Sequence, residues 1–272
     1  MARFSVVTIN FNNKAGLEKT VSSVAAQEFS EFQFIVIDGA STDGAEEVQR
    51  KYQDQFAHWV CEPDNGIYDA MNKGLRLATG DYVCFLNSGD YFTDPKVLWR
   101  VNEAIEKTNE LELYYGNVVL VNETGPTGFL NFRNVDLSFH YTNMVCHQSI
   151  FARRALFEKY SDFRTDFRIS GDYDWELRMF LNPSVRAHFL NFAVCNFTVG
   201  GLSMNRRDLL WKEKEAIKKI YFSKSTRLLM KFLKKSRIDR FLKRKWISMM
   251  IELTSRRKWS RIGLRGDFSK EV

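Results

Sequence analysis

The stretch from Cys61 to Phe92, CEPDNGIYDAMNKGLRLATGDYVCFLNSGDYF, constrains the fold more than any other part of the chain. A turn-forming run, EPDNG, separates the end of one apolar run from a segment whose apolar residues recur at helical spacing. Thr79 and Gly80 end that helix, and residues 82–86 are an apolar run of strand length. The chain becomes polar directly afterwards, from Asn87 to Asp90. The stretch therefore predicts a strand, a turn, a helix and a second strand.

The same alternation continues along the chain. Apolar runs predict strands at 4–9, 32–37, 59–61, 82–86, 113–121, 129–132 and 189–199, and helical spacing predicts helices at 17–27, 45–52, 67–78, 95–107 and 172–181. Strands that alternate with helices of this length form right-handed βαβ units on a parallel sheet. We therefore expect an α/β fold with a mostly parallel central sheet.

Polar residues follow each of the first four predicted strands: Thr8 and Asn10, then Asp38, then Glu62 and Asp64, then Asn87 and Asp90. Such strand ends share one edge of a parallel sheet, where ligands bind in these folds. A single acidic strand end would not indicate a ligand site, because Asp and Asn are common in turns. Glu62 is equally well explained as a turn residue. Four in succession favour a site at this edge.

Two common phosphate-binding loops are absent, since the sequence contains neither GxGxxG nor GxxxxGK[ST]. An acidic rim can still bind a nucleotide diphosphate if a divalent cation offsets the repulsion. Asp90, behind a glycine at a strand end, is the residue best placed to hold that cation.

Charge is distributed unevenly. Residues 205–272 hold 22 Lys+Arg and 7 Asp+Glu, whereas residues 1–204 hold 18 Lys+Arg and 26 Asp+Glu. The four cysteines are scattered without a CxxC pair, which favours buried reduced thiols over disulfides or zinc. The sequence shows no signal peptide and no apolar run of membrane-spanning length, so we expect a protein of the cytoplasmic side.

Six segments in this order, FSVVTINFNN, IDGASTDG, EPDNGIYDAMNKG, FLNSGD, CHQSIF and GDYDWELR, resemble family 2 glycosyltransferases with the GT-A fold. The branch that they resemble makes bacterial colanic acid, exopolysaccharide and lipopolysaccharide. The resemblance covers about residues 3–204. It implies a Rossmann-like GT-A domain at 1–204 and inverting transfer from a nucleotide-diphosphate sugar to a hydroxyl acceptor, with Mg²⁺ or Mn²⁺ as cofactor.

The resemblance also implies roles for single residues. Thr8, Asn10, Asp38 and Asp64 match positions that line the nucleotide pocket. Residues 87–90 stand where the family carries its DxD-type motif, but Asn87 and Gly89 replace two acids and only Asp90 is charged. Asp172 matches the catalytic base, although an Asp at a helix start also reads as a cap. His147 and Gln148 match an acceptor-side motif, and His147 alone reads equally well as an ordinary polar residue.

These residue types suit the chemistry. A carboxylate within hydrogen-bond reach can take the proton of the acceptor hydroxyl. The leaving diphosphate needs its growing charge stabilised, which a cation does as a Lewis acid. The loop Gly200-Gly201-Leu202-Ser203, with Arg206 and Arg207 behind it, either closes over the diphosphate or is a plain turn.

Two other function classes stay open. A non-catalytic module that binds a sugar nucleotide or a glycan is the main alternative, because the DxD-type motif is incomplete. Nucleic-acid binding through the basic end is disfavoured, because the body is acidic and the basic residues alternate with an apolar stripe.

The basic end, residues 205–272, predicts an amphipathic helical extension. Its apolar residues fall three or four apart at Ile238, Phe241, Leu242, Trp246, Met249, Met250 and Leu253, with a looser version at 217–233. Such a helix either packs on the catalytic domain or lies in the membrane interface with its cations on anionic headgroups. The second reading predicts a peripheral protein on the inner face of the cell membrane, acting on a glycan acceptor linked to polyprenyl diphosphate.

Overall fold

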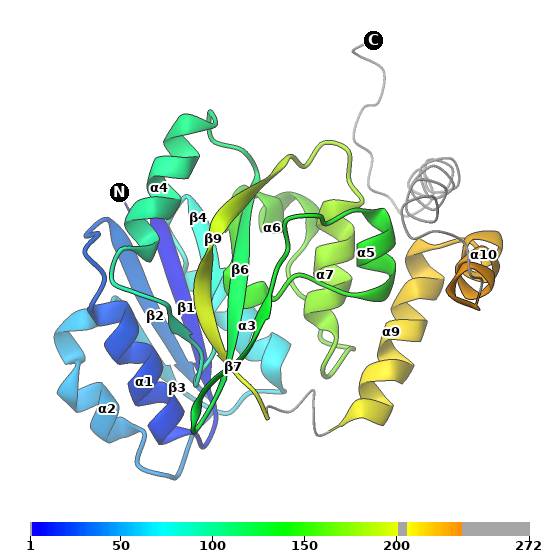
Figure 1. Ribbon diagram of the computed structural model, residues 1–272. Coiled ribbons are helices and arrows are strands. Elements are labelled where there is room, and N and C mark those ends of the chain that lie inside the picture. Colours follow the sequence, from blue (N-terminus) through cyan, green and yellow to red (C-terminus); the bar gives the residue numbers. More distant parts are fainter. Residues whose placement is uncertain (1, 201–205, 236–272) are drawn as a thin grey trace.

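The computed structural model describes residues 2–200 and 206–235 (Figure 1). The strands are β1 (Phe4–Asn10), β2 (Phe32–Asp38), β3 (His58–Cys61), β4 (Tyr82–Phe85), β5 (Tyr91–Phe92), β6 (Leu113–Asn122), β7 (Gly125–Leu130), β8 (Ile150–Arg153) and β9 (Ala187–Thr198). The α-helices are α1 (Lys14–Ala25), α2 (Glu46–Lys51), α3 (Ile67–Leu77), α4 (Val97–Lys107), α5 (Leu137–Thr142), α6 (Ala155–Tyr160), α7 (Gly171–Phe180), α9 (Arg207–Tyr221) and α10 (Lys224–Lys235). The described residues also contain two short 3₁₀ helices, η1 (Gln53–Gln55) and η2 (His147–Ser149).

One sheet organises the molecule, in the strand order β3-β2-β1-β4-β8-β6-β9-β5, with β7 paired to β6. Strands β1 to β4 pair in parallel, as the βαβ pattern predicted. Beyond β4 the sheet is mixed, because β8 runs antiparallel to both β4 and β6 while β9 runs parallel to β6. The expected α/β fold is confirmed, but the described sheet is mixed and not mostly parallel, since four of its eight strand pairings are antiparallel.

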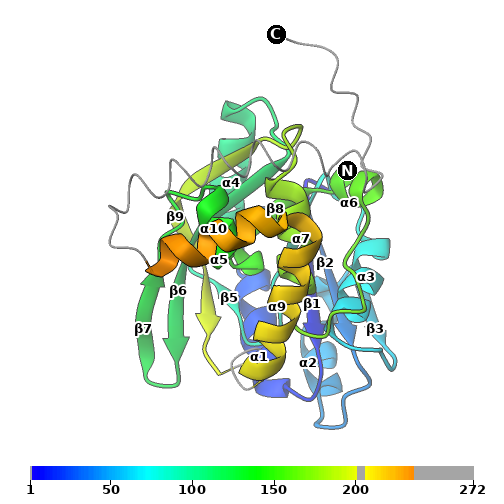
Figure 2. The same cartoon turned by 90° about the vertical axis from the view of Figure 1, so that its right-hand side faces the viewer.

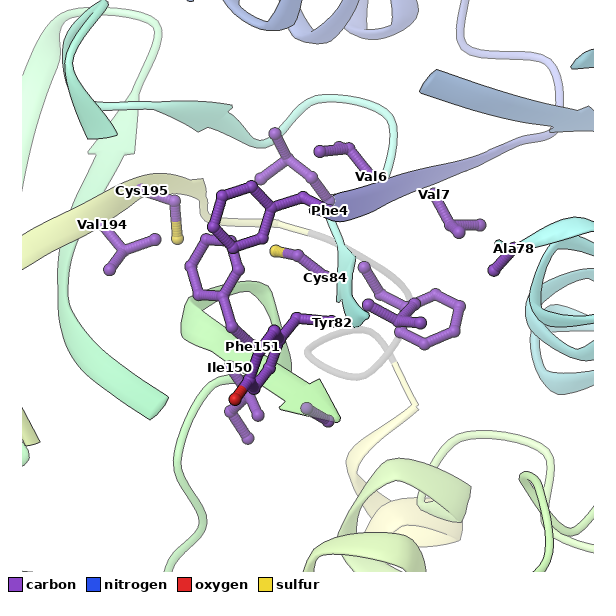
Figure 3. Packing of buried hydrophobic residues seen from close by; sticks show 14 of the residues in the cluster. Phe4, Val6, Val7, Ala78, Tyr82, Cys84, Ile150, Phe151, Val194 and Cys195 are labelled. Carbon is purple, nitrogen blue, oxygen red and sulfur yellow. The ribbon is translucent and has the colours of Figure 1, made fainter. Parts of the chain in front are cut away.

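The centre of the sheet is closely packed on both faces. Strand β1 lies between two parallel neighbours, and all of its residues but Ile9 are buried, so its sequence reads as a nearly continuous apolar run. Figure 3 shows the rings of Phe4, Tyr82 and Phe151 together, and the Phe4 and Phe151 centroids lie 5.5 Å apart in an edge-to-face contact. This rigid centre fixes the positions of the strand ends.

Helix α3 lies directly against the sheet because one of its residues is a glycine. A Cβ added at Gly74 would lie 2.3 Å from Val7 Cγ1. Close approach of the helix to the strand therefore requires a glycine at this position.

The helices α9 and α10 pack on the rest of the molecule (Figure 2). A second apolar cluster joins them to α5 and α7, and its buried members are Tyr141, Phe167, Tyr173, Leu177, Leu181, Ile217, Tyr221, Phe222 and Met230. No helix in the described ranges is long and apolar enough to cross a membrane. The predicted apolar face at 238–253 lies outside the described residues.

Several details depart from the sequence prediction. The strand predicted at 129–132 is found at Gly125–Leu130, as β7. Strand β5 and helix α5 were not predicted, because each is too short to show a periodic pattern. The prediction that the cysteines are buried is wrong for Cys61, which is exposed on the edge strand β3. All four cysteines are free thiols.

Candidate active site

A cleft of about 940 Å³ opens at the carboxyl ends of the parallel strands. Its walls come from the ends of β1, β4 and β9, the start of α3, the turn η2 and the start of α7. The predicted residues that line it are Asn10, Asp64, Asn87, Asp90, His147, Gln148 and Asp172. Residues far apart in the sequence therefore meet at the predicted edge of the sheet.

Asn10 lines the cleft at the end of β1. Its Nδ2 donates to Asp38 Oδ2 at 2.7 Å, and its Oδ1 is buried with no donor among the described residues. Asp38 itself is 1% exposed, and its Oδ1 accepts from the Ser41 N–H at 2.7 Å. A buried amide oxygen without a partner is costly unless a ligand supplies the donor.

Two residues that we expected to line the pocket do not line this cleft. Thr8 is fully buried, and its hydroxyl donates to the Leu86 carbonyl at 2.7 Å, so it ties β1 to the end of β4. Asp38 lies behind Asn10, where its carboxylate is occupied by protein donors. Both residues shape the wall through their neighbours.

The turn before α3 brings Asp64 to the rim. Its Oδ1 accepts from the Gly66 N–H at 2.8 Å, and Gly66 begins the helix at a positive φ of 113°. Directly beside Asp64, just after β2, a Cβ added at Gly39 would lie 2.5 Å from Asp64 Oδ2, so only glycine fits there without movement. Phe11, which the sequence analysis did not identify, is 66% exposed at this rim and offers a face for stacking.

Asp90 lies at the back of the cleft and is 6% exposed. Its Oδ2 accepts from Gln148 Nε2 at 2.8 Å, and its Oδ1 accepts from the Thr198 N–H at 2.9 Å. Burial raises the pKa of Asp90 to about 6, although both hydrogen bonds and His147 oppose the rise. A cation beside this carboxylate would favour its ionised form.

The donor set fits a cation that takes most of its ligands from substrate and water. No group of three or more His, Cys, Asp or Glu residues suited to a metal occurs in the described ranges. Beside Asp90, however, Asn87 Oδ1 is buried and receives no hydrogen bond from the described residues. Mg²⁺ commonly binds through one or two carboxylates plus substrate phosphates and waters.

Asp172 lies at the start of α7 and is held from three sides. Its Oδ2 lies 3.1 Å from His147 Nδ1, and its Oδ1 accepts from the Tyr68 hydroxyl and from the Tyr173 N–H, each at 2.9 Å. Burial opposes ionisation of Asp172, but His147 and Tyr68 outweigh it and lower the pKa of the carboxyl. The result is an ionised carboxylate, 15% exposed, facing the cleft.

His147 connects the carboxylate to the end of β4. Its Nε2 lies 3.1 Å from Asn87 Nδ2, so with that amide donating, Nδ1 carries the proton and donates to Asp172. Tyr68 keeps its proton, because burial and the adjacent Asp172 raise the pKa of its hydroxyl well above the usual value. A Cβ at Gly171 would lie 2.8 Å from the Tyr68 ring, so a glycine permits this contact.

Further charges lie behind Asp172. Glu176 Oε1 lies 2.7 Å from His140 Nδ1 and accepts from the Val145 N–H, and burial raises the pKa of Glu176 against the effect of His140. Lys214 reaches in from α9, with Nζ 4.9 Å from the centre of the Tyr173 ring. Burial lowers the pKa of Lys214, opposed by Asp172 and Glu176.

Sequence reasoning missed Tyr68, Glu176 and Lys214 as neighbours of Asp172. Tyr68 and Glu176 lie within the motif segments EPDNGIYDAMNKG and GDYDWELR, which was the available signal. Arg206 is exposed at the start of α9 and does not line the cleft, whereas Gly200 does. Ser203 lies outside the described residues.

Comparisons with known proteins agree with this geometry. The profile of the family described as "Glycosyl transferase family 2" matches residues 5–161. The "PGL/p-HBAD biosynthesis glycosyltransferase" of Mycobacterium bovis (strain BCG / Pasteur 1173P2) is 30% identical over 205 residues, which cover 74% of this chain and 78% of that protein.

Among solved structures, S. aureus TarS 1–349 aligns with a TM-score of 0.66 at 20% identity, over 99% of this chain and 76% of that one. The same protein has been solved in complex with UDP-GlcNAc. A mannosyltransferase from Pyrobaculum calidifontis, solved with GDP-Man and Mn²⁺, aligns with a TM-score of 0.57 at 16% identity, over 98% of this chain and 76% of that one. These likenesses confirm the expected GT-A architecture.

Proposed function

Because the chain belongs to glycosyl transferase family 2, we propose that it transfers a sugar, with inversion, from a nucleotide-diphosphate sugar to a hydroxyl of a glycan acceptor in surface polysaccharide synthesis. One observation carries the proposal: Asp172, ionised and fixed by His147 and Tyr68, faces the cleft at the strand ends. The mycobacterial relative, whose name places it in PGL/p-HBAD biosynthesis, supports transfer of a sugar in a biosynthetic pathway.

The donor's nucleotide fits the part of the cleft nearest β1 and α3. Asn10 Oδ1 is a buried acceptor that receives no hydrogen bond from the described residues, so it can accept one from the nucleotide. The Asp64 carboxylate can accept further hydrogen bonds, and the exposed ring of Phe11 can stack on the base. Thr8 and Asp38 support this wall from behind. We assign Ser203 to the diphosphate as a further donor. The complex of TarS with UDP-GlcNAc supports a donor of this chemical class.

The chain's own residues supply the base. Asp172 accepts the proton of the acceptor hydroxyl while that oxygen bonds to the anomeric carbon, and the bond from this carbon to the diphosphate breaks on the opposite face. A single displacement of this kind inverts the configuration. His147 Nδ1–H and the Tyr68 hydroxyl orient the carboxylate. We assign His147 and Gln148 to the acceptor side, as the resemblance of CHQSIF implies.

Asp90 and Asn87 are the residues that would hold Mg²⁺ or Mn²⁺. The cation supplies Lewis-acid stabilisation of the charge that develops on the leaving diphosphate. Gln148 Nε2 and the Thr198 N–H keep the Asp90 carboxylate in place. The neighbour solved with Mn²⁺ supports the cofactor class.

We place the protein on the inner face of the membrane, with an acceptor linked to polyprenyl diphosphate. The described part of the C-terminal region supports docking on a membrane surface. Leu228 and Phe232, one helical turn apart on α10, are 58% and 66% exposed. Lys224 and Lys231 are exposed on the same helix. Apolar side chains flanked by cations suit an anionic bilayer surface.

The experiment that tests the function is release of nucleoside diphosphate from UDP-GlcNAc, UDP-glucose and GDP-mannose with Mn²⁺ and a lipid-linked glycan acceptor. Thermal stabilisation by the same donors runs in parallel. Stabilisation together with release establishes a transferase. Stabilisation without release, with every acceptor offered, would instead establish the alternative, a module that binds sugar nucleotides.

A further inference from the structure

We propose that α9 is a working part of the active site and that Glu213 is its positioning residue for the base. Glu213 is 8% exposed, although it belongs to a strongly basic region of the chain. Its Oε1 accepts from the Arg168 N–H at 2.8 Å and its Oε2 accepts from the Ile169 N–H at 3.0 Å. One buried carboxylate thus holds two successive amides of the loop that leads to Asp172.

The geometry of this loop gives the contact its effect. Ile169 lines the cleft, and Ser170 and Gly171 follow it into α7. Ser170 is the N-cap residue of α7, but its side chain makes no capping hydrogen bond to the helix. No described residue other than Glu213 accepts a hydrogen bond from the Arg168 or Ile169 amide. The position of Asp172 along the cleft wall therefore depends on a helix more than 30 residues further along the chain.

A second contact from α9 reaches the first turn of α7. The Tyr221 hydroxyl donates to Asp174 Oδ1 at 2.9 Å, and Asp174 is fully buried. Ile217, which lies on α9 between Glu213 and Tyr221, belongs to the same buried apolar cluster as Tyr173 and Leu177 of α7. Helix α9 thus holds α7 just before and just after Asp172.

The arrangement goes beyond ordinary helix packing. A helix that only covered an apolar face would not need a buried carboxylate aimed at backbone N–H groups, because burying a charge is costly unless it is paired. Charge-assisted bonds to backbone amides are among the stronger and more directional contacts in proteins. Displacement of a catalytic group by about 1 Å can cost about 10²-fold in rate. Helix α9 has this role only if Asp172 is the base proposed above.

The test compares Glu213→Gln with Glu215→Gln. The Gln side chain keeps the shape at position 213 but turns an NH₂ group toward one of the two amides. Glu215 is a matched control two residues along the same helix, where its half-exposed carboxylate pairs with Lys218. Hydrogen exchange of the 168 and 169 amides, and kcat and KM for UDP-GlcNAc, UDP-glucose and GDP-mannose with Mn²⁺, are measured on the full chain.

We expect Glu213→Gln to speed exchange of the two amides by at least about 10-fold and to lower kcat by at least about 10-fold, with the donor KM within about twofold. Glu215→Gln should match the wild type in both measurements. Unchanged exchange, or faster exchange with an unchanged kcat, would overturn the proposal.

Two further results separate the possible failures. If Glu213→Gln does not fold, Tyr221→Phe, which removes only the hydroxyl that binds Asp174, must show the same fall in kcat with an unchanged KM, and a normal kcat overturns the proposal. If the wild type itself releases no nucleoside diphosphate from the three donors, the proposed function fails for them. The exchange comparison still decides whether Glu213 holds the loop.

Discussion

The adjacent residues His147 and Gln148 hold the two carboxylates of the cleft from a single 3₁₀ turn. His147 Nδ1 lies 3.1 Å from Asp172 Oδ2, while Gln148 Nε2 donates to Asp90 Oδ2 at 2.8 Å. The proposed base and the proposed cation ligand are therefore placed relative to each other by one short, largely buried segment. Changes at the two residues should affect different steps.

The first prediction concerns Gln148→Met, which keeps the volume and removes the hydrogen bond to Asp90. We expect the Kd for UDP in the presence of Mn²⁺ to rise by about 10-fold, because residues that orient a metal ligand commonly contribute this much. Turnover at saturating donor should stay within about twofold of the wild type. Titration calorimetry and steady-state rates measure both, and a normal Kd with a reduced kcat would contradict this division of roles.

Tyr68→Phe tests the electrostatics at Asp172. The Tyr68 hydroxyl donates to the ionised carboxylate and helps to lower its pKa, so its loss raises that pKa. The acid limb of the kcat–pH profile should therefore move to higher pH in the variant. The lowered pKa of Asp172 also stabilises the fold above the ordinary carboxyl pKa, and this stabilisation is lost as the pH falls through the lowered value. An acid limb that does not move would show that Asp172 does not control the rate.

Removal of the cation is predicted to stop turnover. Excess EDTA should abolish release of nucleoside diphosphate, and added Mn²⁺ should restore it. Asp90→Ala should weaken Mn²⁺-dependent UDP binding by at least about 10-fold. Asp54→Ala, at an exposed position on η1, is the control for a lost carboxylate. Full turnover in excess chelator would refute the assignment of Asp90.

Leu228→Gln together with Phe232→Gln tests membrane docking through α10. Burial of a Leu or Phe side chain contributes about 1.5–3 kcal/mol, so the double variant should lose more than about 10-fold in affinity for anionic vesicles. Substitution is preferable to truncation near residue 204, because α9 contributes to the apolar cluster around Tyr173. Trp99→Gln, on α4 and 46% exposed, is the control. Equal co-sedimentation of the double variant and the wild type would exclude this surface.

The first half of the fold was predictable because each of its strands and helices shows a clear pattern within its own short segment of sequence. The apolar runs of β1 to β4 and the helical stripe of α3 determine their own structures, and parallel pairing follows from the alternation. The second half was harder to predict. Strand β8 inserts between β4 and β6, and nothing in the periodicity of residues 150–153 indicates that neighbour.

The site likewise has a part that the sequence predicts and a part that it does not. Asn10, Asp64, Asp90 and Asp172 were predictable as residues at strand ends or in motifs, and all four line the cleft. The contacts that orient them were not predictable. Those contacts join residues far apart in the chain, such as Tyr68 to Asp172, and only the tertiary structure brings such partners together.

The central claim, that Asp172 is the base of a glycosyl transfer, is tested most directly by the kcat of Asp172→Asn with a donor that the wild type uses. We expect a fall of at least about 10²-fold with the Kd for UDP unchanged, because the amide keeps the shape but cannot take the proton. Asp162→Asn, an exposed position in the preceding loop, should match the wild type. Near-normal turnover by folded Asp172→Asn would contradict the account and leave Asp172 as a residue that only stabilises the start of α7.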